Sequence, residues 1–189
     1  MFYPKLTRRE NYKTKKNGEW YSSNRYYRKE ILVDCQYRCV YCDITKSEIG
    51  GDDFLQLDHF RPQSLFPELG NNPTNLVAAC PVCNRNKSNH WPVGKDVKES
   101  YSGQVGFIDP FEEESTSYFH ITAKGFIEPL KPPAEYIIKI LRLNRDGSVY
   151  KRKARMLSKE LYFLASKAKN KRGPHVHRKI CELIRNSEI

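Results

Sequence analysis

The chain has 189 residues, of which 39% are hydrophobic and 12% aromatic, which allows one ordinary packed domain and excludes a disordered protein. No stretch approaches the ~20 consecutive apolar residues of a membrane helix, and the basic N-terminus does not read as a secretory signal, so we expect a cytoplasmic protein with no membrane partner. The net charge of +11 is unevenly distributed along the chain. Lys and Arg outnumber Asp and Glu nine to three in residues 1–30 and twelve to two in residues 145–180, whereas residues 31–144 have eleven basic and fifteen acidic side chains. This distribution favours flanks that bind a polyanion and central carboxylates that bind a cation.

Residues 1–36 are predicted to form a basic N-terminal arm and a helix. Residues 1–20 are polar and show little periodicity, so we expect an arm that is mobile or ordered by a partner. The helix is predicted over 22–36, with Tyr26, Ile31 and Val33 supplying its apolar surface.

Residues 37–92 have the order strand, strand, helix. Residues 53–60 alternate between apolar and polar side chains, as a half-buried strand does. The apolar run "LVAAC" at 76–80 is a second short strand, and Pro81 suits the first turn of the helix after it. This part is therefore predicted to be the compact β-β-α core of an α+β protein.

Residues 93–189 are predicted to form a hairpin and a mainly helical C-terminal lobe. The hairpin is expected over 118–130 and an amphipathic helix over 134–143. The helix predicted over 148–170 is strongly basic, and its charges either hold a polyanion or form a solvated face. A last helix is expected over 175–188.

Two Cys-x-x-Cys pairs lie at the two ends of the predicted core, Cys39 with Cys42 and Cys80 with Cys83. The two-residue spacing lets both thiolates of a pair face one ion, and four thiolates complete a tetrahedral structural zinc site. In a cytoplasmic chain such pairs favour zinc over disulfides. Cys35, one helical turn before Cys39, is a competing ligand. A closed four-thiolate site leaves no open position for substrate, so any reaction takes place elsewhere.

The core resembles the four-cysteine, ββα-metal branch of the HNH nucleases, a treble-clef-like fold. The resemblance is carried by the two cysteine pairs together with Asp58-His59, Asn75, Asn84 and Lys87. More loosely, "LDHFRPQS", "NLVAACPVCNRNKS", "GFIDPF" and "LRLNR" resemble bacterial HNH proteins of restriction and phage-defence systems. The resemblance implies an endonuclease that hydrolyses phosphodiester bonds, most simply in DNA with RNA not excluded, and leaves 5′-phosphate and 3′-hydroxyl ends.

The resemblance also implies a role for each residue of the catalytic set. His59 is the general base that deprotonates water, a task that suits imidazole near neutral pH. Asp58 and Asn84 offer hard oxygen ligands to a catalytic Mg²⁺ or Mn²⁺. Asn75 orients the strand that carries His59 through hydrogen bonds from its side chain to the backbone.

Arg61 and Lys87 are the predicted nucleic-acid contacts. Lys87 lies on the face of the helix that carries the metal ligand, from where we expect it to reach a phosphate, and Arg61 is expected to do likewise. One difficulty remains. Asp58 and His59 are neighbours in a strand and should point to opposite sides, so both can serve one metal site only if the strand ends, twists or bulges there.

Two alternatives stay open. One is a non-catalytic zinc module that binds nucleic acid, although the set of Asp58, His59 and Asn84 argues against it. The other is a nuclease subunit that stays idle until a partner such as an ATPase engages its C-terminal lobe. The apolar faces around 136–143 and 156–164 are either core or partner surface. The sequence leaves the oligomeric state and the cleaved sequence open.

Overall fold

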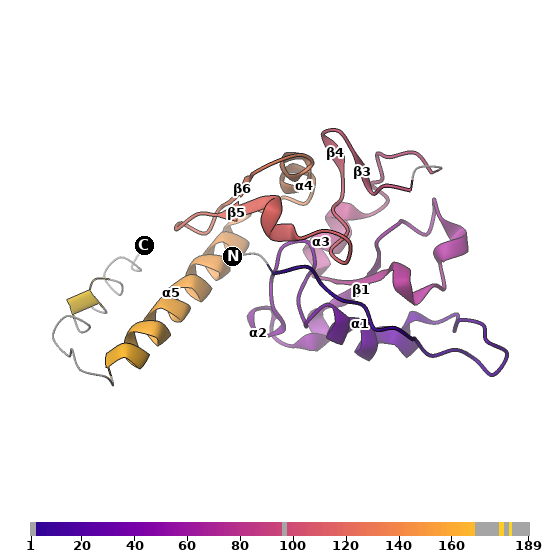
Figure 1. Ribbon diagram of the computed structural model, residues 1–189, viewed down its shortest axis with the longest axis horizontal. Helices are drawn as coiled ribbons and strands as arrows, with labels where there is room; N and C mark the ends of the chain where they lie inside the picture. The colour runs from indigo at the N-terminus through magenta and orange to yellow at the C-terminus, as the bar shows by residue number, and fades with distance from the viewer. Residues whose placement is uncertain (1–2, 96–97, 169–177, 180–181, 183–189) are drawn as a thin grey trace.

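The computed structural model describes residues 3–95, 98–168, 178, 179 and 182. A body of short helices and two-stranded sheets carries one long helix that extends away from it (Figure 1). This mixture of helices and small sheets confirms the predicted α+β class. No helix in the described part of the chain is long and apolar enough to cross a membrane. The predicted helix over 175–188 falls largely outside the described residues.

The N-terminal part contains two short helical elements before the core. A 3-10 turn, η1 (Asn24–Tyr27), runs directly into α1 (Arg28–Asp34). The buried face of this unit begins at Tyr27, so the predicted apolar contacts Tyr26 and Val33 are 55% and 46% exposed, while Ile31 is buried. Tyr27 and Ile31 are four residues apart, and this spacing puts them on one face.

The prediction of a mobile or partner-ordered arm is wrong for residues 3–12, which pack along the core. Tyr3 is only 2% exposed. Arg8 donates a hydrogen bond of 3.1 Å to the backbone carbonyl of Leu76. Arg9 forms an ion pair of 2.9 Å with the buried Asp34 of α1. The aromatic and apolar residues between the charges give this segment an inner face, and both arginines tie it to the core.

The centre of the molecule is a β-hairpin capped by a helix, as predicted. Strand β1 (Gln56–His59) pairs antiparallel with β2 (Leu76–Ala79), whose four residues are all buried. Helix α3 (Pro81–Lys87) follows at once, with its proline in the first turn, where a missing N–H costs nothing. It packs against β1.

The C-terminal part adds two further hairpins and two helices. The hairpin β5–β6 and helix α4 confirm the predictions for this region, whereas β3 and β4 were not predicted because each is only two residues long. The remaining elements, in chain order, are α2 (Lys46–Ile49), η2 (Asp52–Phe54), η3 (Pro67–Leu69), η4 (Pro73–Asn75), β3 (Tyr101–Ser102), β4 (Val105–Gly106), η5 (Ser115–Ser117), β5 (Phe119–Ile121), β6 (Ile127–Pro129), α4 (Ala134–Ile140) and α5 (Asp146–Ala168).

The two apolar faces with an open role differ. Around 136–143 the side chains belong to the core, since Leu141 and Leu143 are fully buried. Helix α5 instead leaves the body part-way along its length (Figure 1), and its distal half exposes Tyr162 by 79% and Phe163 by 54%. The first face is therefore core, and part of the second is open surface.

Candidate active site and metal centre

The four paired cysteines converge at one buried point. Cys39 and Cys42 come from the turn after α1, and Cys80 and Cys83 from the start of α3. Their sulfur atoms all lie within 4.8 Å of one another, and the Sγ atoms of Cys42 and Cys80 are 3.7 Å apart. Zinc–sulfur bonds of ~2.3 Å in a tetrahedron separate the sulfurs by about 3.8 Å. The donor set and its spacing therefore fit a structural zinc ion.

Backbone hydrogen bonds hold the first cysteine pair beside the second. The N–H of Val40 donates to the carbonyl of Ala78 in β2 at 2.9 Å, and the N–H of Asp43 donates to the carbonyl of Cys39 at 2.9 Å. Hydrogen bonds from Cys39 and Cys42 lower the pKa of the Cys80 thiol, whereas burial raises the pKa of Cys39. A lowered pKa favours the thiolate, which is the form that binds zinc.

Cys35 is not part of this cluster. Its Sγ atom accepts a hydrogen bond of 3.3 Å from the N–H of Ala78. Burial raises the pKa of Cys35 to about 12, so this side chain stays a neutral thiol at physiological pH. Among the described residues, the sulfur cluster therefore consists of the four paired cysteines without Cys35.

Three of the four predicted catalytic residues line one open cavity beside α3. Its volume is about 600 Å³. Asp58 and His59 come from the end of β1 and Asn84 from α3. The other lining residues belong to the loop after β1 and to the segment after α3: Pro62, Gln63, Ser64, Pro67, Ser88 and Asn89.

His59 is held by one backbone acceptor. Its Nε2 atom lies 2.9 Å from the carbonyl oxygen of Gly70. A carbonyl oxygen can only accept a hydrogen bond, so Nε2 carries the ring proton in the neutral imidazole. Nδ1 is then the nitrogen with a lone pair, and it can accept a proton from water.

Asp58 is buried, and its contacts are all on one oxygen. The hydroxyl of Tyr41 donates to Oδ2 at 2.6 Å, and Nζ of Lys87 lies 3.2 Å from the same atom. Within the described residues, Oδ1 accepts no hydrogen bond, and Asp58 lines the cavity. Burial raises the pKa of Asp58, and the charge of Lys87 opposes that shift.

Asn84 is oriented by a neighbour on β1. Its Nδ2 atom donates a hydrogen bond of 2.9 Å to Oε1 of Gln56. That bond uses the amide nitrogen and leaves the amide oxygen as a donor atom for a cation. A carboxylate oxygen and an amide oxygen beside a wet cavity fit a hard divalent ion such as Mg²⁺ or Mn²⁺.

The end of β1 explains how two neighbouring residues can line one cavity. The strand stops at His59, and Asn75 fixes the chain beyond it: its Oδ1 accepts from the N–H of Arg61 at 2.9 Å, and its Nδ2 donates to the Arg61 carbonyl at 3.0 Å. These are the bonds to the backbone that we expected of Asn75. Asp58 faces α3 and His59 faces Gly70, and the cavity reaches around the strand end to both.

The predicted phosphate contact by Lys87 is wrong. Its side chain is fully buried, and Nζ donates to the backbone carbonyl of His59 at 2.8 Å as well as pairing with Asp58. The face of α3 that carries Lys87 packs against β1, so the ammonium group points into the protein. Burial lowers the pKa of Lys87, and the charge of Asp58 opposes that shift.

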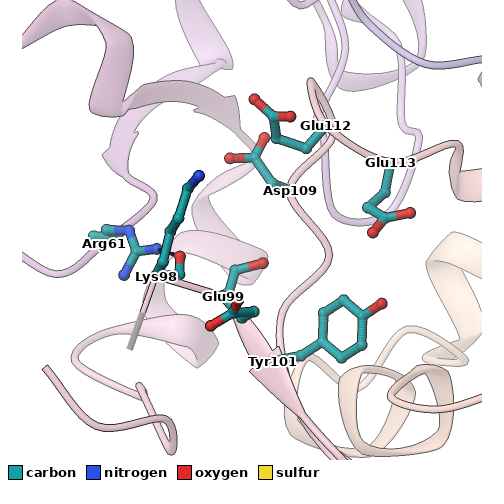
Figure 2. A pocket seen from close by; sticks show the side chains of 8 residues that line it. Arg61, Lys98, Glu99, Tyr101, Asp109, Glu112 and Glu113 are labelled. Carbon is teal, nitrogen blue, oxygen red and sulfur yellow. Dashed lines mark hydrogen bonds between the residues drawn. The ribbon is translucent and has the colours of Figure 1, made fainter. Parts of the chain in front are cut away.

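Arg61 lines a different cavity of about 530 Å³ (Figure 2). Its guanidinium group lies 4.9 Å from the ring centroid of Trp91 and donates to the backbone carbonyl of Lys98. Figure 2 shows Arg61 and Lys98 at one side of a space whose other side carries carboxylates, among them Asp109 and Glu112. Arg61 does not line the His59 cavity, and its phosphate contact stays a prediction.

Sequence reasoning missed three contributors to these sites. Tyr41 lies between the two cysteines of the first pair. The sequence shows this tyrosine beside the metal ligands, but it does not show that the hydroxyl group binds Asp58. Gly70 acts through its backbone and gives no side-chain signal. Arg145 donates to the sulfurs of three zinc cysteines, yet it is 62 or more residues from each of them in sequence.

Residues 39–90 match the HNH endonuclease family. The chain is also 30% identical over 74 residues to the Septu protein PtuB of Bacillus thuringiensis, which corresponds to 39% of this chain and 28% of that protein. The match thus spans little more than a quarter of that relative. No solved structure is significantly similar to the chain. The segment in the family match contains both cysteine pairs and all residues of the predicted catalytic set.

Proposed function

From the premise that residues 39–90 are an HNH endonuclease domain, we propose that this chain is a metal-dependent endonuclease that hydrolyses phosphodiester bonds in DNA. The observation that carries the proposal is the cavity that Asp58, His59 and Asn84 line together. The zinc centre has no open coordination position, so its role is to hold the fold. The chemistry belongs to the open cavity that Asp58, His59 and Asn84 line.

In the proposed reaction His59 is the general base. The Gly70 carbonyl holds Nε2–H, so Nδ1 faces the water that attacks the phosphorus atom. The ring gains a proton in this step, and the same carbonyl can still accept the Nε2–H hydrogen bond of the resulting imidazolium. The acceptor at Gly70 therefore fixes both the tautomer and the ring orientation.

Asp58 and Asn84 would hold the divalent ion, through Oδ1 of the carboxylate and the amide oxygen. When bound there, Mg²⁺ or Mn²⁺ would polarise the scissile phosphate and stabilise the leaving oxygen. Tyr41 and Lys87 hold Oδ2 of Asp58, which turns Oδ1 toward the cavity. Lys87 also binds the carbonyl of His59, so one ammonium group positions both residues.

We further propose that the chain acts in restriction or phage defence together with a protein partner such as an ATPase. The looser sequence resemblance and the similarity to a protein named Septu protein PtuB support this role. The exposed aromatic side chain of Tyr162 on α5 offers a surface to such a partner. The alternative of a non-catalytic binding module has less support, because binding alone does not require an oriented imidazole at the cavity.

The test is cleavage of supercoiled plasmid by the zinc-loaded protein, with Mg²⁺, with Mn²⁺ and without added divalent ions. We expect nicked or linear product only when a divalent ion is added, with 3′-hydroxyl and 5′-phosphate ends that a ligase can reseal. An RNA of matching sequence is the second substrate, and faster RNA cleavage would overturn the choice of DNA. Binding without cleavage under every ion would favour the binding module, or a subunit that needs its partner.

A further inference from the structure

The zinc centre has a fifth protein contact that does not come from the HNH segment. Arg145 directly precedes α5. Its Nη2 atom lies 3.5 Å from Sγ of Cys80 and 3.7 Å from Sγ of Cys42, and both of its terminal nitrogens lie 3.8 Å from Sγ of Cys83. One planar guanidinium group therefore donates to three of the four sulfurs.

The charge of the centre explains why a cation belongs there. A zinc ion with four thiolates carries a net charge of about −2, and this charge is buried. The buried Asp43, which follows Cys42 in the chain, adds a further negative charge, but Arg38 at 2.6 Å and Arg155 at 2.9 Å pair with it. These two arginines are thus engaged by a carboxylate, and Arg145 is the cation that hydrogen-bonds to the sulfurs themselves.

The position of Arg145 depends on how α5 is attached to the body. The buried Arg152 donates from Nε to the carbonyl of Gly125 at 2.7 Å, in the turn of the β5–β6 hairpin. This turn lies so close to α5 that a Cβ on Gly125 would be 2.5 Å from the carbonyl oxygen of Val149. The neighbouring Lys151 donates to the carbonyl of Glu48 in α2 at 2.6 Å. The first turns of α5 are therefore fixed between α2 and the hairpin.

We propose that Arg145 is a latch between the zinc centre and the C-terminal lobe, such that zinc retention depends on docked α5 and docking of α5 depends on zinc. The guanidinium group offsets the charge of the thiolates and donates hydrogen bonds to them, so it protects them from protons and from competing ligands. When the ion leaves, the four sulfurs are no longer held around one point, and Arg145 loses the acceptors that fix it. Coupling of two equilibria is reciprocal, so both directions follow from one contact.

Arg145 and Lys159 provide a matched pair for the test. Both are cationic residues at α5, but Lys159 is exposed and is not in contact with the zinc sulfurs. In the full-length zinc-loaded protein, release of zinc to an excess of a chromogenic chelator is followed at neutral pH. We expect Arg145→Gln to release zinc about 10- to 100-fold faster than wild type, the range found when residues that support metal ligands are replaced. Lys159→Gln should release it at the wild-type rate.

A second variant covers the case in which Arg145→Gln does not fold. Arg145→Lys keeps the charge but loses the planar fork, so its release rate should lie between those of wild type and the glutamine variant. The reciprocal effect is measured by hydrogen exchange in residues 146–156, which should be faster in wild-type protein without zinc and in holo Arg145→Lys. Wild-type zinc release or unchanged exchange in the lysine variant would overturn the latch. Neither measurement uses cleavage, so the latch and the proposed nuclease activity fail separately.

Discussion

The cysteine cluster and the His59 cavity, both built in part from helix α3, hold charge in opposite ways. At the cluster, the sulfurs of four cysteines from two segments enclose a single point, and Arg145, directly before α5, covers it. At the cavity, Asp58 has one oxygen fixed by Tyr41 and Lys87 and the other at an open space of about 600 Å³. The first arrangement encloses its four sulfurs, whereas the second leaves a carboxylate oxygen and the imidazole of His59 at an open cavity.

This difference shows where the basic residues of the chain are used. Lys87 and Arg155 each pair with a buried carboxylate, and Arg145 donates to the buried cysteine sulfurs. Positive charge that sequence counting assigns to nucleic-acid binding thus serves in part to pair with groups inside the protein. The remaining exposed cations are the ones available to a DNA backbone.

The largest effect should come from removing one ligand of the cysteine cluster. Cys80→Ser removes one of the four thiolates, and because a structural zinc site contributes on the order of 10 kcal/mol or more to folding, we expect loss of zinc and of the cooperative melting transition. Metal content and thermal unfolding measure this. Cys35→Ser is the control, since its thiol lies outside the cluster, and it should keep one zinc ion per chain. Full zinc content in the Cys80 variant would contradict the four-thiolate assignment.

A smaller loss of stability is expected at the His59 cavity, from Lys87→Met. This change leaves the buried carboxylate of Asp58 without its counter-charge, and breaking such a pair typically costs about 3–5 kcal/mol. Urea unfolding of the zinc-loaded protein measures the free energy of unfolding. The exposed Arg85 on the same helix gives the control, and Arg85→Met should change stability by no more than about 0.5 kcal/mol. Unchanged stability with weaker DNA binding in the Lys87 variant would restore the phosphate contact.

The smallest effect should come from Tyr41→Phe, because Tyr41 lies in the zinc loop but binds Asp58. Its hydrogen bond lowers the pKa of Asp58, against the increase caused by burial. Without that bond the pKa of Asp58 rises further, so the acid limb of the pH profile of cleavage should move to higher pH. Zinc content should be unchanged, and the stability loss should be about 1.5–3 kcal/mol.

Tyr37→Phe is the matched control for this shift, since the Tyr37 hydroxyl makes no hydrogen bond within the described residues. Its pH profile should follow that of wild type. An acid limb that stays in place in Tyr41→Phe would show that the Tyr41 hydroxyl does not act on Asp58.

The sequence predicted what depends on short spacing or on period. The cysteine pairs, the β-β-α order and the helix that starts at Pro81 all follow from neighbours a few residues apart, and the structure confirms them. The adjacency of Asp58 and His59 raised a conflict that spacing could not resolve. Its resolution needed the strand end at His59 and the loop bonds of Asn75, which connect residues 14 or more positions apart.

Other features could not be predicted because they arise from tertiary packing. Residues 3–20 have no clear period, yet Tyr3 is buried against segments far along the chain. Lys87 reads as a surface cation in a short helix, and only the packing of α3 on β1 shows that it is buried. Arg145 meets the zinc cysteines across 62 to 103 residues of sequence.

The central claim is that His59 is the base of a nuclease site, and plasmid cleavage by His59→Ala tests it most directly. His90→Ala serves as the control, since His90 is an exposed histidine that does not line the cavity. With zinc content and DNA binding equal in all three proteins, cleavage by His59→Ala should be slower by about 10²- to 10⁴-fold, the usual contribution of a general base, while His90→Ala cleaves like wild type. Cleavage by His59→Ala at the wild-type rate would contradict the account.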